Sequence, residues 1–236
     1  MLVPSMNATE IKTQVYREFD KLFNTTVKRL STEYDRERKK LKIDKTRMYV
    51  KDYHIKTTGK NNWIICIGKA ASKEKYDGIG TLAVCTVVYY YTEKGIRVFN
   101  PLKDGFVAVY NGHLFQRYNE RLHLNLSQPV DILSHFFKND AELHDTIIEK
   151  QQRQYTVGFC KSGMLLGEYI PEDNWQIWKT FVSRDLTRAS QHETENELLN
   201  DLYVQLEAAL KSDNCDKKQV WMLQNKISYL TGRTIE

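Results

Sequence analysis

The run Phe106-Val-Ala-Val-Tyr110, followed two residues later by His113-Leu-Phe-Gln-Arg-Tyr-Asn-Glu-Arg121, carries the most information about the fold. The first run is apolar and rich in β-branched residues, which is typical of a strand with both faces covered. In the second run, apolar side chains recur at positions 114, 115, 118 and 122, the spacing of one face of a helix. The sequence therefore predicts a buried strand that leads directly into a helix over about residues 111–122.

The charged side chains of this predicted helix also share a face. They lie four, seven and eight residues after the first of them, offsets that coincide on a helix with about 3.6 residues per turn. The four residues are His113, Arg117, Glu120 and Arg121. A histidine exchanges protons near neutral pH and arginines are permanent cations, so the set is suited to act on a phosphodiester. The same residues equally fit a solvated helix face with an ordinary ion pair between successive turns.

Further elements are expected on both sides of this stretch. An apolar stripe at steps of three and four predicts one long helix over 8–42, opened by a capping box of Asn7 and Glu10. Apolar runs between turn residues predict strands at about 48–58, 63–67, 82–91, 95–99, 155–160, 164–170 and 176–182. Helices are expected at 128–139 and twice within 190–232, and 140–153 is interpreted as helix or loop. The core face expected for the first C-terminal helix consists of Leu198, Leu199, Leu202, Leu206 and Leu210.

Together these elements predict a single α+β domain over residues 1–236. Its sheet is expected to be mixed or mostly antiparallel, flanked by a long N-terminal helix and two C-terminal helices that pack with it. The expected regions are a basic amphipathic helix (8–42), a strand-rich region (48–110), a core that carries the motif (111–185) and a C-terminal helical pair (190–232).

Composition excludes several classes of protein. A hydrophobic content of 41% and a charged content of 28% describe a folded globular chain rather than a disordered one. No stretch approaches the roughly 20 apolar residues of a membrane-spanning helix. The first residues lack the basic start and apolar run of a signal peptide. We therefore expect no membrane partner and a cytoplasmic location.

The net charge of +5 is unevenly distributed. Residues 1–60 hold 15 Lys and Arg against 8 Asp and Glu, so they carry +7 and the remainder carries −2. The excess gathers near the end of the long helix, at Arg36, Arg38, Lys39 and Lys40. Such a cluster attracts phosphates through a salt-sensitive interaction, although it also fits the solvated end of a helix.

No cofactor or metal site is predicted. The four cysteines are scattered, without a Cys-x-x-Cys pair, which argues against a zinc ribbon and against a disulfide framework. This pattern favours a reduced, cytosolic setting. The histidines outside the motif helix show no metal-ligand spacing; they are His54, His123, His135, His144 and His192.

The motif helix is followed by a second expected helix and by a three-strand meander that ends in Trp178-Lys-Thr-Phe-Val-Ser183. This order of elements, with the His–Arg–Glu–Arg helix, resembles the small RNase toxins related to BrnT and RelE, in the barnase–EndoU–colicin–RelE superfamily. The resemblance covers residues 110–185, about a third of the chain. Such toxins are short, whereas this chain continues well beyond that core on both sides.

The resemblance implies metal-independent cleavage of RNA by a protein of a bacterial or phage toxin, mobile-element or defence system. In that chemistry a 2′-hydroxyl attacks the adjacent phosphate while one group removes its proton and another protonates the leaving oxygen. His113 would be the general acid or base, and Glu120 would take the hydroxyl proton or orient an arginine. Arg117 and Arg121 would clamp the phosphate. Three residues at the end of the last strand would line the same cleft: Thr180, Ser183 and Arg184.

Two other functions fit the same sequence. In the first, a non-catalytic nucleic-acid-binding or regulatory protein binds through its basic N-terminal helix, and the motif helix braces the fold. Its affinity should fall steeply with ionic strength. In the second, the terminal helices dock another protein, such as an inhibitor, or a second copy of the chain.

Overall fold

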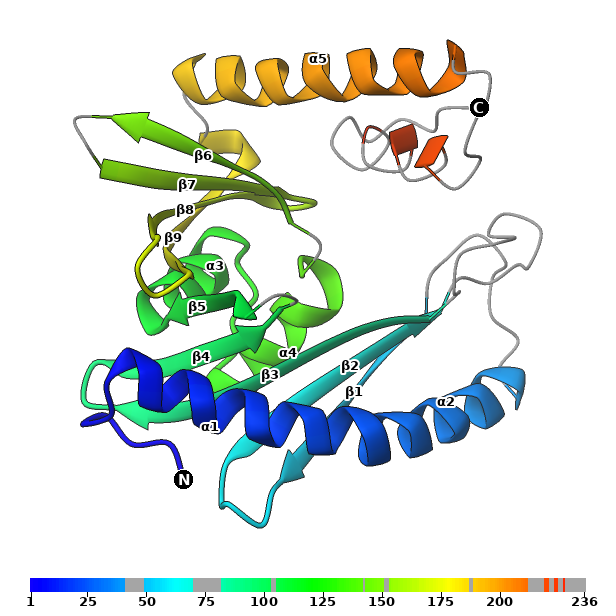
Figure 1. Cartoon of the computed structure of the whole chain (residues 1–236), viewed down its shortest axis with the longest axis vertical. Coiled ribbons are helices and arrows are strands. Elements are labelled where there is room, and N and C mark those ends of the chain that lie inside the picture. Colours follow the sequence, from blue (N-terminus) through cyan, green and yellow to red (C-terminus); the bar gives the residue numbers. More distant parts are fainter. Residues whose placement is uncertain are drawn as a thin grey trace.

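The apolar runs of the sequence become the strands of one nine-stranded sheet in the computed structural model of the chain (Figure 1). The strand order across the sheet is β1-β2-β3-β4-β5-β9-β8-β7-β6. Neighbouring strands are antiparallel except β5 and β9, which are parallel. With helices on its faces, this sheet gives the molecule its α+β character.

The structure describes residues 1–40, 49–69, 82–102, 105–141, 143–150, 153–186 and 189–211, together with 219, 220, 223, 224 and 227. The strands are β1 (Tyr49–Lys56), β2 (Asn62–Lys69), β3 (Leu82–Thr92), β4 (Gly95–Pro101), β5 (Val107–Asn111), β6 (His144–Lys150), β7 (Arg153–Cys160), β8 (Gly163–Ile170) and β9 (Trp175–Ser183). The helices are α1 (Ala8–Lys21), α2 (Lys28–Lys40), α3 (Gly112–Arg121), α4 (Pro129–Asn139) and α5 (Ala189–Lys211).

The long N-terminal helix is interrupted by a π-helical segment. This segment, η1 (Leu22–Val27), joins α1 to α2, so the helical path runs from Ala8 to Lys40, and positions 41 and 42 lie outside the described residues. The predicted capping box is confirmed, because the Asn7 side chain accepts from the Glu10 backbone and the Glu10 side chain accepts from the Asn7 backbone. None of the described helices is long and apolar enough to cross a membrane.

Side-chain alternation along β9 shows which helices cover which face of the sheet. Trp178 and Phe181 pack in the cluster beneath α3 and α4, whereas Trp175 and Ile177 pack with α1. Val182, next to Phe181, packs with α5. A bulge in the pairing of β8 with β9 keeps Ile177 and Val182 on one face. Helices α3 and α4 therefore cover one face, and α1, α2 and α5 cover the other.

The expected packing of the N-terminal helix with the C-terminal pair differs from what the structure shows. The buried apolar residues of α1 and α5 belong to separate clusters, on β2–β5 with β9 and on β7–β9 respectively. Figure 1 shows α1 and α2 lying along β1–β4, with α5 at the opposite end of the molecule. The sheet is wide enough for the two terminal helices to bury their apolar stripes on largely different strands, with β9 shared between them. The second C-terminal helix lies mostly outside the described residues.

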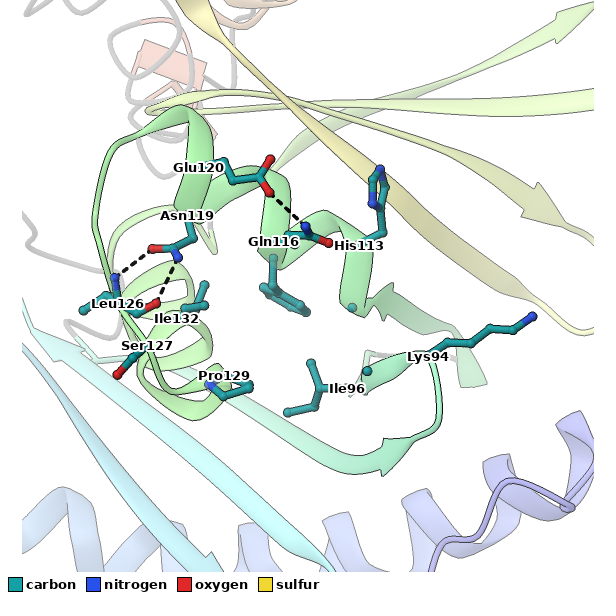
Figure 2. A pocket seen from close by; sticks show the side chains of 13 residues that line it. Lys94, Ile96, His113, Gln116, Asn119, Glu120, Leu126, Ser127, Pro129 and Ile132 are labelled. Carbon is teal, nitrogen blue, oxygen red and sulfur yellow. Dashed lines mark hydrogen bonds between the residues drawn. The ribbon is translucent and has the colours of Figure 1, made fainter.

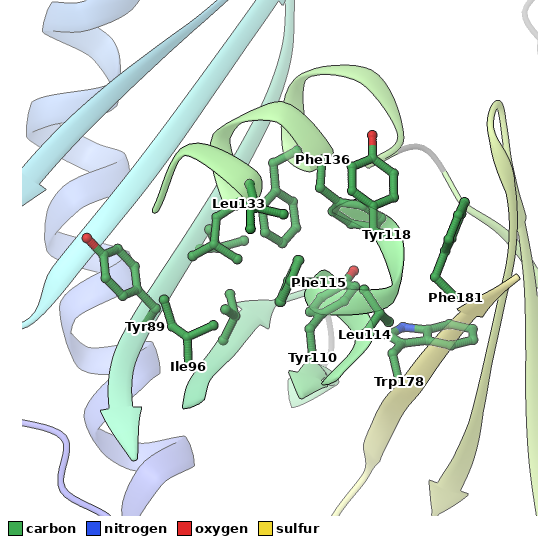
Figure 3. Packing of buried hydrophobic residues seen from close by; sticks show 14 of the residues in the cluster. Tyr89, Ile96, Tyr110, Leu114, Phe115, Tyr118, Leu133, Phe136, Trp178 and Phe181 are labelled. Atoms are coloured by element: carbon green, nitrogen blue, oxygen red, sulfur yellow. The ribbon is translucent and has the colours of Figure 1, made fainter. Parts of the chain in front are cut away.

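Aromatic rings fill the interface between the sheet and the helices α3 and α4 (Figure 3). The Tyr118 ring of α3 meets Phe136 of α4 edge to face, with centroids 5.1 Å apart, and Phe181 of β9 at 5.0 Å. Edge-to-face pairs contribute about 0.5–1.5 kcal/mol each beyond the burial of their area. This packing fixes α3 on the sheet and so positions every side chain on its outer face.

Two local predictions are wrong. Residues 144–150, expected as helix or loop, form β6, so four strands rather than three follow the second helix. Because β6 is an edge strand, Ile147 and Ile148 remain exposed, and its sequence lacks the apolar alternation of a half-buried strand. Leu210, expected on the core face of α5, is 55% exposed.

Candidate functional site

The chain passes from β5 into α3 with no loop between them. Leu114, Phe115 and Tyr118 are buried against the sheet, which confirms the predicted helix and its apolar face. The first helical residue must be small: a Cβ atom at Gly112 would lie 2.9 Å from the carbonyl oxygen of Ile96 in β4. The start of α3 is thereby held directly against the backbone of the sheet.

The outer face of α3 carries three of the four charged motif residues. His113 is exposed. The carboxylate of Glu120 accepts two hydrogen bonds, from Nη1 of Arg117 at 3.0 Å and from Nε2 of Gln116 at 2.8 Å. The side chains of Arg117 and Glu120 are 43% and 44% exposed, so this ion pair is a surface pair. Solvent screening makes such pairs worth little to stability.

His113 and Glu120 line the same open cavity, of about 460 Å³ (Figure 2). Gln116 lies between them on α3, and Lys94 of the β3–β4 turn stands at the edge. Apolar side chains also line the cavity, including Phe115, Ile96 and Ile132. An apolar hollow with a few convergent polar groups is the usual form of a ligand site. Reasoning from the sequence missed Lys94 and Gln116, although Gln116 lies one turn from His113 on the same helical face.

The loop that borders this cavity is held by Asn119 of α3. Its Nδ2 donates to the carbonyl oxygen of Leu126 at 3.0 Å, and its Oδ1 accepts from the backbone nitrogen of Leu126 at 3.1 Å. Within this loop, His123 and Asn125 have positive φ angles of 51° and 56°. A side chain that satisfies both backbone groups of one residue keeps the connection to α4 in a fixed shape. Leu126, which lines the cavity, is thereby held against α3.

Arg121 does not join the open face. Its Nη1 donates to the backbone carbonyl of Phe181 in β9, so the guanidinium ties the end of α3 to the sheet. Arg121 was expected to bind phosphate, but here its guanidinium binds the backbone of β9 instead. The expected pair of phosphate-clamping arginines is thus separated, with Arg117 outside and Arg121 against the sheet.

The three residues expected to complete the cleft are dispersed. Thr180 is next to Phe181, whose ring packs beneath α3, so strand alternation directs Thr180 to the opposite face of the sheet. Ser183 is buried. Arg184 donates to the carbonyl oxygens of Lys161 at 3.0 Å and Cys160 at 3.4 Å, which ties it to the β7–β8 turn.

The predicted basic cluster lies at the end of α2, far along the chain from the motif. Arg36 is exposed there. Arg38, Lys39 and Lys40 belong to the helix, but their side chains lie outside the described part of the structure. Because α2 covers the face opposite α3, Arg36 and the cavity beside His113 lie on opposite faces of the sheet.

The inner face of α3 contributes to a buried hydrogen-bond network around Asp140, which is fully buried. Its carboxylate accepts from the Tyr118 hydroxyl at 2.6 Å, and from the Ser162 backbone nitrogen and hydroxyl at 2.7 and 2.9 Å. Since the Tyr118 proton goes to Asp140, the Nδ1 of His135, 3.0 Å away, donates to the Tyr118 oxygen. Burial lowers the pKa of His135, although Asp140 opposes this effect. The network joins α3, α4 and the β7–β8 turn.

A serine, a histidine and an aspartate also meet between β1 and α4. Nε2 of His54 lies 3.1 Å from Oδ2 of Asp52 and 3.2 Å from Oγ of Ser134. A nucleophilic triad uses both ring nitrogens of its histidine, one for each partner. Here Nε2 of His54 contacts both Asp52 and Ser134, which is not the geometry of a triad. These contacts connect β1 to α4. Lys138 adds an ion pair to Asp52 at 3.1 Å.

Within the described residues, no three His, Cys, Asp or Glu side chains gather in a way that could hold a metal ion. The titratable side chains that line the cavity are those of His113, Glu120 and Lys94. Comparison of the chain with protein-family models, with curated proteins and with solved structures finds no match.

Proposed function

We propose that the protein is a metal-independent ribonuclease whose reacting groups are His113 and Glu120. The observation that carries the proposal is that these two side chains, one an imidazole and one a carboxylate, line one open cavity. The resemblance of the motif helix to the RNase toxins agrees with this chemistry. The proposal narrows the site that the sequence suggested, because Arg121 and Thr180 point elsewhere.

The spacing on α3 determines how the groups would act. His113 and Glu120 are seven residues apart, about 10 Å along the helix axis, so a phosphodiester would lie between them across Gln116. One of the two removes the proton of the 2′-hydroxyl, and the other protonates the leaving 5′-oxygen. Arg117, one turn from His113, supplies the cation for the charge that develops on the phosphate.

Cleavage of labelled single-stranded RNA in the presence of EDTA tests this proposal. We expect RNA but not DNA to be cut, because only RNA supplies the attacking 2′-hydroxyl. His113→Ala and Glu120→Gln should each lower the rate by at least about 100-fold, the usual contribution of a general acid or base. His123→Asn is the matched control, since His123 is exposed, lies just beyond α3 and has a φ of 51° that asparagine tolerates. Equal rates in His113→Ala and His123→Asn would refute the proposal.

The exposed cation at the end of α2 favours a second function, binding of nucleic acid without cleavage. Arg36 extends from the part of the helix where the apolar stripe gives way to charge. We expect affinity for RNA to fall steeply with salt, and to fall further when Arg36, Arg38, Lys39 and Lys40 are replaced by glutamate. Retention of full affinity after this charge reversal would exclude the basic helix as the binding surface.

A further inference from the structure

Two cysteines that the sequence leaves 19 positions apart meet in the sheet. Cys66 in β2 is the direct register partner of Cys85 in the antiparallel strand β3, and both thiols are free. Opposed residues of an antiparallel pair have their side chains on the same face, with Cα atoms about 4.5 or 5.5 Å apart. Both separations fall within the range of roughly 4.4–6.8 Å that a disulfide spans.

The two thiols differ in their access to solvent. Cys66 is buried in the cluster beneath α3 and α4. Cys85 is partly exposed and lines a second open hollow of about 220 Å³, together with Asn100 and Ala141. Nδ2 of Asn100 lies 3.9 Å from the Cys85 sulfur. A small solute that enters this hollow contacts Cys85, whereas Cys66 is not among the residues that line it.

We propose that Cys66 and Cys85 form a reversible cross-strand disulfide when the protein meets a peroxide. The Cys85 thiolate attacks one peroxide oxygen, the O–O bond breaks, and a sulfenic acid and hydroxide result. The Cys66 sulfur then attacks the Cys85 sulfur, the S–S bond forms, and hydroxide leaves. In total, two thiols lose two electrons and two protons, and one hydrogen peroxide becomes two waters.

The surroundings of the thiols set how the rate depends on pH. Burial raises the pKa of Cys85 to about 12, and burial beside Cys85 also raises the pKa of Cys66. Because the thiolate is the reacting form, oxidation should accelerate about tenfold per pH unit from 7 to beyond 9. An exposed cysteine with a pKa near 8.5 levels off in that range.

The geometry also makes the bond easy to reduce. Opposed Cβ atoms in a sheet lie about 4.5–5.5 Å apart, whereas a disulfide places them about 3.8 Å apart. Closing the bond therefore draws β2 and β3 together, and the strain this introduces raises the reduction potential. A dithiol reductant should restore both thiols quickly.

The test is peptide mapping of the full chain after treatment with hydrogen peroxide, followed by alkylation in denaturant. We expect a cross-linked pair of peptides that contain Cys66 and Cys85, lighter by two hydrogens and separated by dithiothreitol. Cys160 is the internal control: it is buried, its thiol donates to the carbonyl oxygen of Gly163 at 3.3 Å, and it should remain alkylatable. Two alkylated cysteines at 66 and 85, or a cross-link from either to Cys160 or Cys215, would overturn the proposal.

A variant separates the two steps. In Cys85→Ser, which changes the partly exposed member, Cys66 should stay reduced under the same treatment because Cys66 does not line the hollow. Oxidation of Cys66 at the wild-type rate in this variant would contradict the assigned order. Circular dichroism of the variant confirms that the comparison is made on folded protein.

Discussion

Carboxylates accept hydrogen bonds on both faces of α3, but one is buried and the other is exposed to solvent. On the inner face, His135 bonds to Tyr118 and Tyr118 donates to Asp140, whose carboxylate is fully buried and accepts three hydrogen bonds. On the outer face, Glu120 accepts two hydrogen bonds while 44% of its side chain remains exposed. A buried network left half satisfied is costly, whereas a surface pair can break at little cost. Only the outer groups are therefore free to exchange partners with a ligand.

Removal of Asp140 should have the largest effect on stability. Asp140→Ala removes the buried acceptor that binds the Tyr118 hydroxyl and both the backbone nitrogen and the hydroxyl of Ser162. We expect a loss of about 3–5 kcal/mol in the free energy of unfolding, measured by urea titration. Glu172→Ala, at an exposed turn position, is the control and should stay within about 0.5 kcal/mol of wild type. A loss at Asp140 no larger than that of the control would show that the inner network does not hold α3 in place.

The junction of β5 and α3 should be the next most sensitive point. In Gly112→Ala the new methyl group must displace the backbone of Ile96, from which it would lie 2.9–3.0 Å. Overpacking of this kind costs about 1–3 kcal/mol. Asn111→Ala is the matched control, because Asn111 precedes the helix without a side-chain capping bond. Thermal unfolding of the two variants should differ by several degrees, and equal midpoints would mean that the helix start shifts freely on β4.

The contrast between buried and exposed faces also explains which elements could be predicted from the sequence. Helix α3 and strand β5 were placed within one or two residues, since their buried faces impose an apolar pattern on neighbouring positions. Trp175 and Trp178, three residues apart in β9, lie on opposite faces of the sheet, as strand alternation requires. Strand β6 was missed because an exposed edge imposes no such pattern: Ile147 and Ile148 both face solvent.

The candidate site was predicted only in part, for a different reason. Sharing a helix face is a local property, so His113 and Glu120 could be grouped from their spacing. The position of the Arg121 side chain depends on its bond to the Phe181 carbonyl, 60 residues away. The face of the sheet on which Thr180 lies depends on a bulge in β9. The approach of Cys66 to Cys85 likewise depends on the register of two strands. None of these long-range relations leaves a signal in the spacing of residues.

Asp52 is neither fully buried like Asp140 nor as exposed as Glu120. Its contribution to the free energy of unfolding should depend on pH. Burial alone would raise the pKa of Asp52, but hydrogen bonds from His54, Lys138 and Ser134 outweigh it and lower the pKa from 3.8 to about 2. The unfolded chain therefore takes up the proton first as the pH falls. The stability that Asp52 contributes is present above about pH 4 and is lost between pH 4 and 2.

This contribution is roughly 2 kcal/mol for a side chain that is 20% exposed. Urea titrations at pH 5, 4 and 3 measure it. In Lys138→Met the loss over this range should shrink, whereas Lys179→Met, which removes an exposed pair with Glu168, should leave it unchanged. Identical pH profiles for Lys138→Met and wild type would show that the ion pair does not set the pKa of Asp52.

The smallest effect on stability is expected for the exposed residues of the proposed active site. Glu120→Gln and Arg117→Gln should each change the free energy of unfolding by no more than about 0.5 kcal/mol, since both partners are more than 40% exposed. A double-mutant cycle isolates their coupling, which should also remain below about 0.5 kcal/mol. A coupling above about 1 kcal/mol would mean that the outer face of α3, like the inner one, is committed to the fold. In that case a loss of RNA cleavage in Glu120→Gln would report on structure, and only His113, which has no part in the pair, would remain as a test of the chemistry.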